Sequence, residues 1–257
     1  MYKALVFFDL DNTLLNAQTR VDPEVAAAMD SLRQNNVLPV ISTGRNIFEI
    51  PNTMRNTKID TVVSGNGDYV IYEGKPVYAV EFPKTLVAEM AAYAADFEDA
   101  VAVLNSKESH MNKVTKLTQQ AYDSVNSTVP PLGAEEFWQN NQVNMMIVMT
   151  QGHDADYRLK FGDQLTFYRN TPFSMDIVLK GNSKSEGIKQ LIKNAGLEGI
   201  PTYAFGDGNN DIPMLDFVDH PVAMGNALDN VKPYAEFITT NNTDHGIVNG
   251  LKHFDLI

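Results

Sequence analysis

The stretch Ala4-Leu5-Val6-Phe7-Phe8-Asp9-Leu10-Asp11-Asn12-Thr13 decides the fold, because five consecutive apolar residues lead directly into two aspartates. An uninterrupted apolar run of this length is typical of a strand that is buried on both faces, as in the centre of a parallel sheet. In open α/β sheets, ligands bind beyond the carboxyl ends of the strands. We therefore expect a functional site to begin at Asp9 and Asp11, where this strand stops.

The segments that follow alternate between helix and strand signals. Asp22-Pro23-Glu24 supplies an N-cap, a proline at the first helical position and an acid in the first turn, which predicts a helix to about Asn35. Apolar runs at 37–42 and 60–64 predict two further strands. This alternation indicates βαβ units, and hence a parallel sheet with right-handed crossovers.

The stretch from 83 to 174 differs in character. Pro83 opens an alanine-rich helix, and the later strand-like runs at 100–104, 143–150 and 165–169 have helical or polar stretches between them. We interpret this stretch as an inserted α+β domain.

The α/β alternation then resumes with a predicted strand at 176–179 and a helix that begins at Ser183-Lys184-Ser185-Glu186, a capping-box pattern. Short apolar runs at 202–205 and 221–224 predict two more strands. The expected fold is therefore α/β. A Rossmann-like parallel-sheet core is formed by residues 1–82 and 175–257, and the inserted α+β domain spans 83–174.

Composition limits the classes of function. The chain has 257 residues, a net charge of -12 and no cysteine. The negative charge disfavours nucleic acids and anionic membranes as partners, and the absence of cysteine fits a cytoplasmic location. The N-terminal apolar run of five residues is far too short for a signal peptide or a membrane span.

Acidic residues recur at the predicted strand ends. Asp207 and Asp211 follow the strand at 202–205, as Asp9 and Asp11 follow the first strand. Any one aspartate after a strand is most often a turn former. A cluster of Asp9, Asp11 and Asp207, however, would repel itself unless a hard cation such as Mg²⁺ lay among the oxygens. The sequence thus predicts a metal site at this edge of the sheet.

Two further features indicate an anion site. Lys184 lies in the first turn of a predicted helix, where the helix dipole disfavours a cation unless an anion is near. Thr43-Gly44 follows the strand at 37–42 and offers a hydroxyl and an unhindered backbone amide to a phosphate oxygen. Arg45 comes next and has two interpretations, a substrate contact or a brace for the sheet.

Four ordered motifs resemble those of the haloacid dehalogenase superfamily, and within it the Cof-type phosphatases with a C2-type cap between the second and third motifs. The resemblance covers the whole chain. It departs at Asn12, where the family usually has glycine, and at Asp68, where it usually has alanine. The motifs are Asp9-Leu10-Asp11-Asn12-Thr13-Leu14-Leu15, Ser42-Thr43-Gly44-Arg45, Gly181-Asn182-Ser183-Lys184 and Gly206-Asp207-Gly208-Asn209-Asn210-Asp211.

The resemblance implies a mechanism and a role for each matching residue. Asp9 would attack phosphorus to give an aspartyl-phosphate, while Asp11 would protonate the leaving oxygen and later activate water. Mg²⁺ would be held by Asp9, the backbone carbonyl of Asp11 and Asp207, and Asp211 would order a metal-bound water or Lys184. The phosphate oxygens would meet the Leu10 backbone, Thr43, Gly44, Lys184 and Asn210.

The resemblance also implies the type of substrate, a small phosphorylated metabolite. Sugar phosphates are favoured, and nucleotides and cofactor phosphates are the alternatives. A sugar phosphomutase of the same superfamily remains open as a second enzyme, and a receiver-like module with Asp9 as phosphoacceptor remains open as a non-enzyme. The sequence gives no indication of the oligomeric state.

Overall fold

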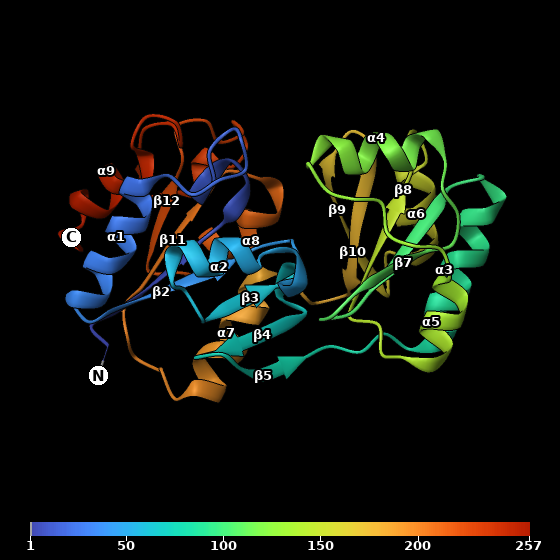
Figure 1. The fold of residues 1–257 in the computed structure, drawn as a ribbon, viewed down its shortest axis with the longest axis horizontal. Helices are drawn as coiled ribbons and strands as arrows, with labels where there is room; N and C mark the ends of the chain where they lie inside the picture. Colours follow the sequence, from blue (N-terminus) through green and yellow to red (C-terminus); the bar gives the residue numbers. More distant parts are fainter. Residues whose placement is uncertain (1) are drawn as a thin grey trace. The chain divides into compact units, whose positions relative to one another are not determined.

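A computed structural model describes residues 2–257, without the side chain of Asn170. The chain divides into two compact units, residues 1–78 with 183–257 and residues 79–182. The first unit contains an eight-stranded sheet in the order β13-β12-β11-β1-β2-β3-β4-β5 (Figure 1). Its strands are Ala4–Phe8 (β1), Val37–Ser42 (β2), Val62–Ser64 (β3), Tyr69–Tyr72 (β4), Lys75–Ala79 (β5), Thr202–Gly206 (β11), His220–Ala223 (β12) and Phe237–Ile238 (β13).

The sheet of the first unit is mainly parallel, as the sequence predicts. β1 is central and pairs in parallel with β2 on one side and β11 on the other. All five residues of β1 are buried, which explains its continuous apolar character. The pairs β2–β3, β11–β12 and β12–β13 are also parallel, whereas β3 and β4 pair antiparallel. One edge of the sheet is therefore formed by the carboxyl ends of the parallel strands β1, β2, β3, β11 and β12.

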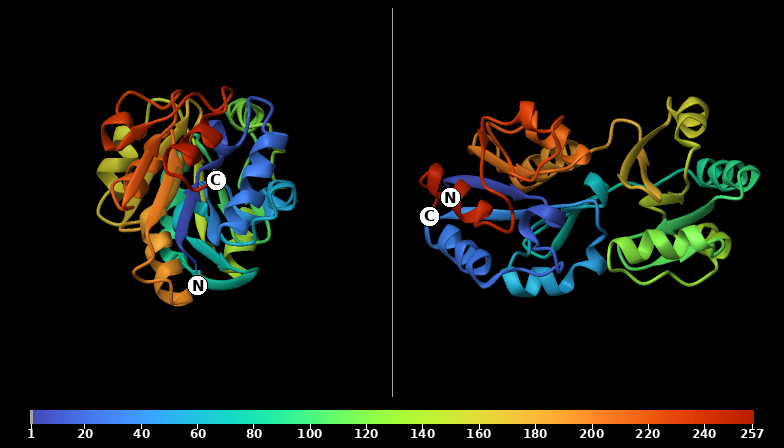
Figure 2. Two further views of the ribbon diagram at one scale, coloured as in Figure 1. Left: turned by 90° about the vertical axis from the view of Figure 1, so that its left-hand side faces the viewer. Right: turned by 90° about the horizontal axis from the view of Figure 1, so that it is seen from above.

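Helices cover both faces of this sheet (Figure 2). On one face, Met29 of α1 and Leu251 of α9 share a cluster with Val6 and Phe8. On the other, Ile188 of α7 and Met214 of α8 pack with Leu5 and Phe7. The helices of the unit are Pro23–Gln34 (α1), Pro51–Thr57 (α2), Lys184–Ala195 (α7), Ile212–Leu215 (α8) and Gly246–His253 (α9).

The second unit has a five-stranded sheet in the order β7-β6-β8-β10-β9, and its described pairings are antiparallel. Its inner face packs on α3, α5 and α6 around Met90, Phe137 and Tyr157. The elements are Lys84–Asp96 (α3), Ala100–Leu104 (β6), Ser109–Met111 (β7), Lys116–Ser124 (α4), Ala134–Asn140 (α5), Met145–Met149 (β8), Asp154–Phe161 (α6), Leu165–Thr171 (β9) and Ser174–Leu179 (β10).

Both domain boundaries expected from the sequence, after residues 82 and 174, are wrong, because the second unit spans residues 79–182. Phe82, for example, packs in the core of the second unit. The strand predicted at 176–179 was assigned to the core, but β10 lies between β8 and β9 in the sheet of the second unit. Its apolar pattern is equally compatible with either sheet, so only strand pairing decides its place.

None of the helices among residues 2–257 is long and apolar enough to cross a membrane.

Candidate active site

Asp9 is the first residue after β1 and is 6% exposed. Its carbonyl accepts the amide of Leu14 at 3.1 Å, which closes a wide turn over Leu10–Leu14. Within that turn Asn12 has φ 59°, as expected for an asparagine in a position that the family usually fills with glycine. The turn reverses the chain at the end of β1 and leaves the Asp9 carboxylate at the carboxyl edge of the sheet.

Lys184 lies between two aspartates from other parts of the chain. Its Nζ donates to Oδ1 of Asp9 at 2.5 Å and to Oδ1 of Asp211 at 2.6 Å, and its side chain is 0% exposed. Lys184 is the first residue of α7, whose N-cap Ser183 accepts the amide of Glu186 at 3.3 Å. The anionic partners that its unfavourable place at a helix start predicts are therefore these two carboxylates.

Close backbone contact fixes the start of α7. A Cβ atom placed on Gly67, which has φ +101°, would lie 2.1 Å from the carbonyl oxygen of Ser183. A Cβ on Gly187 would lie 2.6 Å from the Cα of Gly67. Only glycines allow this approach, and it sets the depth at which Lys184 enters the site.

Asp207 and Asp211 complete the acidic group. Oδ2 of Asp211 accepts the backbone amides of Asp207 and Gly208, each at 2.9 Å. Oδ1 of Asp207 accepts the hydroxyl of Thr13 at 2.9 Å. One carboxylate oxygen from each of Asp9, Asp207 and Asp211 lies within 4.8 Å of the others. Strand order thus brings together residues that are up to about 200 positions apart in the chain.

Burial and mutual repulsion shift the pKa values of this group. Burial, followed by the charge of Asp211, raises the pKa of Asp9 well above its usual range, although Lys184 opposes the shift. The same two causes raise the pKa of Asp207 to about 7. Burial by itself would lower the pKa of the Lys184 ammonium, but the Asp211 and Asp9 carboxylates outweigh it and raise that pKa. One lysine does not neutralise three carboxylates.

This donor set fits a hard divalent cation. Three carboxylates that repel one another in a buried space match the preference of Mg²⁺ for oxygen ligands. Because the oxygens of Asp211 are already occupied by Lys184 and two amides, Asp9 and Asp207 are better placed for direct contact. Among the described residues, the carboxylate of Asp11 lies outside this group. The family resemblance implies the backbone carbonyl of Asp11, and not its carboxylate, as a metal ligand.

The Asp11 carboxylate pairs with Arg45 instead. The guanidinium donates from Nε to Oδ2 at 2.8 Å and from Nη2 to Oδ1 at 2.6 Å. This two-pronged ion pair links the turn after β1 to the loop after β2. The sequence left Arg45 open between a substrate contact and a brace, and neither interpretation included Asp11.

The expected phosphate ligands lie on the same edge. Leu10 begins the turn after Asp9, and Thr43 and Gly44 follow β2, with Thr43 buried and Gly44 half-buried. Oγ1 of Thr43 accepts the amide of Arg45 at 3.0 Å. Asn210 follows β11 and donates from Nδ2 to Oδ1 of Asn66 at 2.9 Å.

Several supporting residues were not assigned from the sequence. Thr13 orients Asp207, Asn66 holds Asn210, and Asn226 donates from Nδ2 to the carbonyl of Asn12 at 2.8 Å. Thr13 lies in the first of the four family motifs, and this was the only signal for it in the sequence. The partners of these residues are too distant in the sequence for a local pattern to predict.

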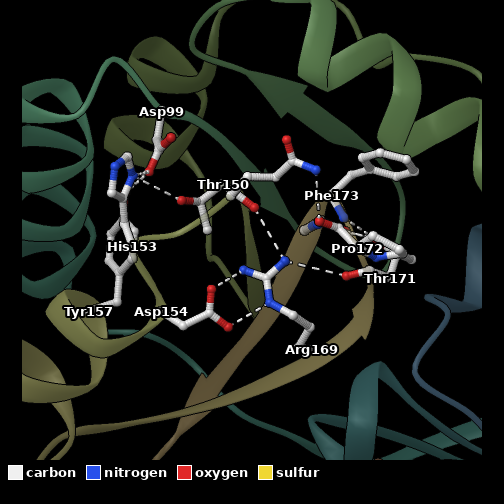
Figure 3. A network of polar contacts seen from close by, with 11 residues as sticks. Asp99, Thr150, His153, Asp154, Tyr157, Arg169, Thr171, Pro172 and Phe173 are labelled. Carbon is white, nitrogen blue, oxygen red and sulfur yellow. Dashed lines mark hydrogen bonds and ion pairs between the residues drawn. The ribbon is translucent and has the colours of Figure 1, made fainter.

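The second unit contains a separate polar network at the ends of β8 and β9 (Figure 3). Oδ2 of Asp99 accepts the Tyr157 hydroxyl at 2.8 Å and lies 3.1 Å from Nδ1 of His153. The Thr150 hydroxyl lies 3.2 Å from the same Nδ1. A catalytic triad would need the acid and the hydroxyl on opposite ring nitrogens, so this network is structural.

Arg169 reinforces the same end of the sheet. It pairs with the Asp154 carboxylate and donates from Nη1 to the carbonyls of Thr150 and Thr171. These bonds connect β8, β9 and the start of α6.

The fold and the acidic edge define an enzyme class, and comparison with known proteins agrees with it. The model of the haloacid dehalogenase-like hydrolases matches residues 6–251. The chain therefore belongs to this family, and it is a phosphatase of the Cof type.

Three solved structures illustrate the similarity. A hypothetical protein of Geobacillus kaustophilus is 31% identical, with a TM-score of 0.89 over 98% of this chain and 99% of that one. The phosphatase BT1666 of Bacteroides thetaiotaomicron is 26% identical, with a TM-score of 0.90 over 100% and 96%. The subclass IIB sugar phosphatase BT4131 is 26% identical, with a TM-score of 0.87 over 98% and 99%.

Proposed function

We propose that this phosphatase hydrolyses small-molecule phosphate monoesters, sugar phosphates in first place, with Mg²⁺ and through an aspartyl-phosphate on Asp9. The observation that carries the proposal is the buried contact of Lys184 with Asp9 and Asp211, beside Asp207. A nucleophile, a fixed cation and a carboxylate site for a metal then share one edge of the sheet. The named sugar phosphatase among the similar structures supports this substrate class.

In the first half of the reaction, a carboxylate oxygen of Asp9 attacks phosphorus. The bond from phosphorus to the leaving oxygen breaks, and Asp11 gives its proton to that oxygen. Lys184 engages Oδ1 of Asp9, so we expect attack from Oδ2. In the second half, water attacks phosphorus and passes its proton to Asp11. Inorganic phosphate then leaves, and the Asp9 carboxylate is regenerated.

The metal, when bound at Asp9 and Asp207, would offset negative charge on the transferring phosphoryl group. The residues of the chain supply the other interactions. Lys184 provides a buried positive charge, and the Thr43 hydroxyl and the Leu10 and Gly44 amides are candidate donors to phosphate oxygens. The second unit (residues 79–182) is proposed as the cap that selects the leaving group and excludes water.

The test is phosphate release from a panel of sugar phosphates, nucleoside monophosphates and cofactor phosphates, with Mg²⁺ and with EDTA. We expect the highest kcat/KM for sugar phosphates, and activity that EDTA abolishes. Asp9→Asn should lose at least about 1,000-fold in kcat, whereas Asp30→Asn, which removes a surface ion pair with Arg33, should not. Undiminished hydrolysis by Asp9→Asn would contradict the assignment of the nucleophile.

The same panel separates the alternatives. A phosphomutase would require a bisphosphate activator and release no inorganic phosphate. A receiver-like module would take up one phosphoryl group without steady turnover.

A further inference from the structure

Asp11 lies in an exposed part of the turn and has little local support. Its side chain is 43% exposed, compared with 9% for Asp9. The backbone at Asp11 is extended, with φ -72° and ψ 125°, just before the left-handed Asn12. An exposed aspartate in such a turn can adopt several rotamers, so its direction depends on contacts from outside the turn.

Arg45 supplies those contacts. It binds both carboxylate oxygens of Asp11, at 2.8 and 2.6 Å, in the planar fork geometry that only arginine offers. A carboxylate has about four lone-pair positions, and the fork uses one on each oxygen. The remaining positions stay available for a proton exchanged with a leaving group or with water.

Arg45 is itself fixed by its surroundings. Its amide donates to Oγ1 of Thr43 at 3.0 Å, and its carbonyl accepts the amide of Gly65 at 3.0 Å. Glu49, held by the Asn46 amide at 2.7 Å, adds a second nearby carboxylate on the same loop. Because Arg45 is held in the loop that contains Thr43, its guanidinium fixes the position of the Asp11 carboxylate relative to that loop.

We propose that Arg45 is the positioning residue for Asp11, and that it aligns the Asp11 carboxylate for proton transfer at the leaving-group oxygen. This inference rests on the proposed function, because it takes Asp11 as the general acid. It assigns Arg45 to the acid-base step through Asp11, rather than to a substrate contact or to bracing of the sheet.

Leaving-group dependence tests this role. An alkyl phosphate needs a proton on its leaving oxygen, whereas p-nitrophenyl phosphate releases a stable phenolate without one. Arg45→Gln should lower kcat/KM, which contains only the first half of the reaction, about 100-fold for a hexose phosphate, with at least a tenfold smaller loss for p-nitrophenyl phosphate. Arg45→Lys, which keeps the charge but not the fork, should show an intermediate loss on the hexose phosphate.

Two controls sharpen the experiment. Arg33→Gln removes another arginine of the first unit, which pairs with Asp30 and donates to the Thr57 carbonyl, and it should leave both activities unchanged. In an Asp11→Asn background, Arg45→Gln should cause no further loss, because both changes remove the same step. Melting temperatures identify a variant that fails to fold, and Arg45→Lys then carries the comparison.

Equal losses of kcat/KM on both esters, no loss on either, or additive losses in the double variant would overturn the role of Arg45. Failure of the wild type to hydrolyse either ester would instead contradict the proposed function, so the two failures are distinguishable.

Discussion

The ammonium of Lys184 lies 2.5 Å from Oδ1 of Asp9, across 175 positions of the sequence and with no exposed surface on the lysine side chain. The same ammonium contacts Asp211. Lys184 is therefore both a buried charge that depends on its partners and the fixed cation closest to the proposed nucleophile. Its removal should affect stability and turnover through different partners.

Lys184→Met leaves buried carboxylates without their counter-charge. Loss of one partner of a buried ion pair costs about 3–5 kcal/mol, so the free energy of unfolding should fall by that order in metal-free protein. Removal of a positive charge from the phosphoryl site should lower kcat about 100- to 1,000-fold. Urea titration and steady-state kinetics measure the two effects.

The double variant Lys184→Met with Asp211→Asn separates these effects. It should recover part of the lost stability, because it removes one unpaired carboxylate, but none of the lost kcat. Recovery of turnover would show that Lys184 acts only as a counter-charge for Asp211.

Asp207→Asn should stabilise the metal-free protein. Burial and the charge of Asp211 raise the pKa of Asp207, so its ionised form is unfavourable in the fold. The melting temperature at pH 8 in EDTA should rise by about 2–4 °C for each kcal/mol of relieved repulsion. The increase in melting temperature that Mg²⁺ produces in the wild type should be absent from the Asp207→Asn variant. A variant that melts lower than the wild type in EDTA would contradict the repulsion.

The stability of the metal-free protein should depend on pH through Asp207. Its pKa is about 7 in the fold, whereas an aspartate in water has an ordinary pKa of 3.8. Between these values the folded state keeps a proton that the unfolded state has lost, so stability falls as pH rises. Unfolding by urea in EDTA at pH 4.5 to 7.5 should show this decline in the wild type.

The difference between the wild type and Asp207→Asn isolates this contribution, because their other ionisable groups are the same. The wild type should lose stability relative to the variant as pH rises. The Mg²⁺-induced stabilisation should grow over the same range, since the ligand must be deprotonated. A difference that does not change with pH would exclude Asp207 as the source.

Gly67→Ala should displace the start of α7. Its Cβ would lie 2.1 Å from the Ser183 carbonyl, and the backbone there cannot move without carrying Lys184. The free energy of unfolding should fall by about 1–2 kcal/mol because of the left-handed backbone and by about 1–3 kcal/mol because of overpacking. We expect a parallel loss of kcat.

Gly74→Ala is the matched control. Gly74 has φ +76° and nothing within 4 Å of an added Cβ, so it isolates the backbone cost. Its kcat should equal that of the wild type. Equal destabilisation by the two substitutions would show that the contact with Ser183 is not limiting.

The central strands and their ends could be predicted because the signals are local. β1 and β2 begin and end as expected, since continuous burial requires continuous apolar residues. The helix start at Ser183 was likewise apparent, because a capping pattern depends on a few neighbouring residues. The sheet to which β10 belongs could not be predicted, because an apolar strand does not specify the strands with which it pairs.

The sequence by itself determined the class of fold, the aspartates at the strand ends, and the presence of a lysine at a helix start that called for an anion. Tertiary structure decided which polar groups meet: Lys184 with Asp9 and Asp211, the Thr13 hydroxyl with Asp207, and Arg45 with Asp11. The physical reason is the range of the forces. Burial and backbone preference act on neighbouring residues, whereas the pairing of charges depends on strand order and on close packing at Gly67, which no local pattern contains.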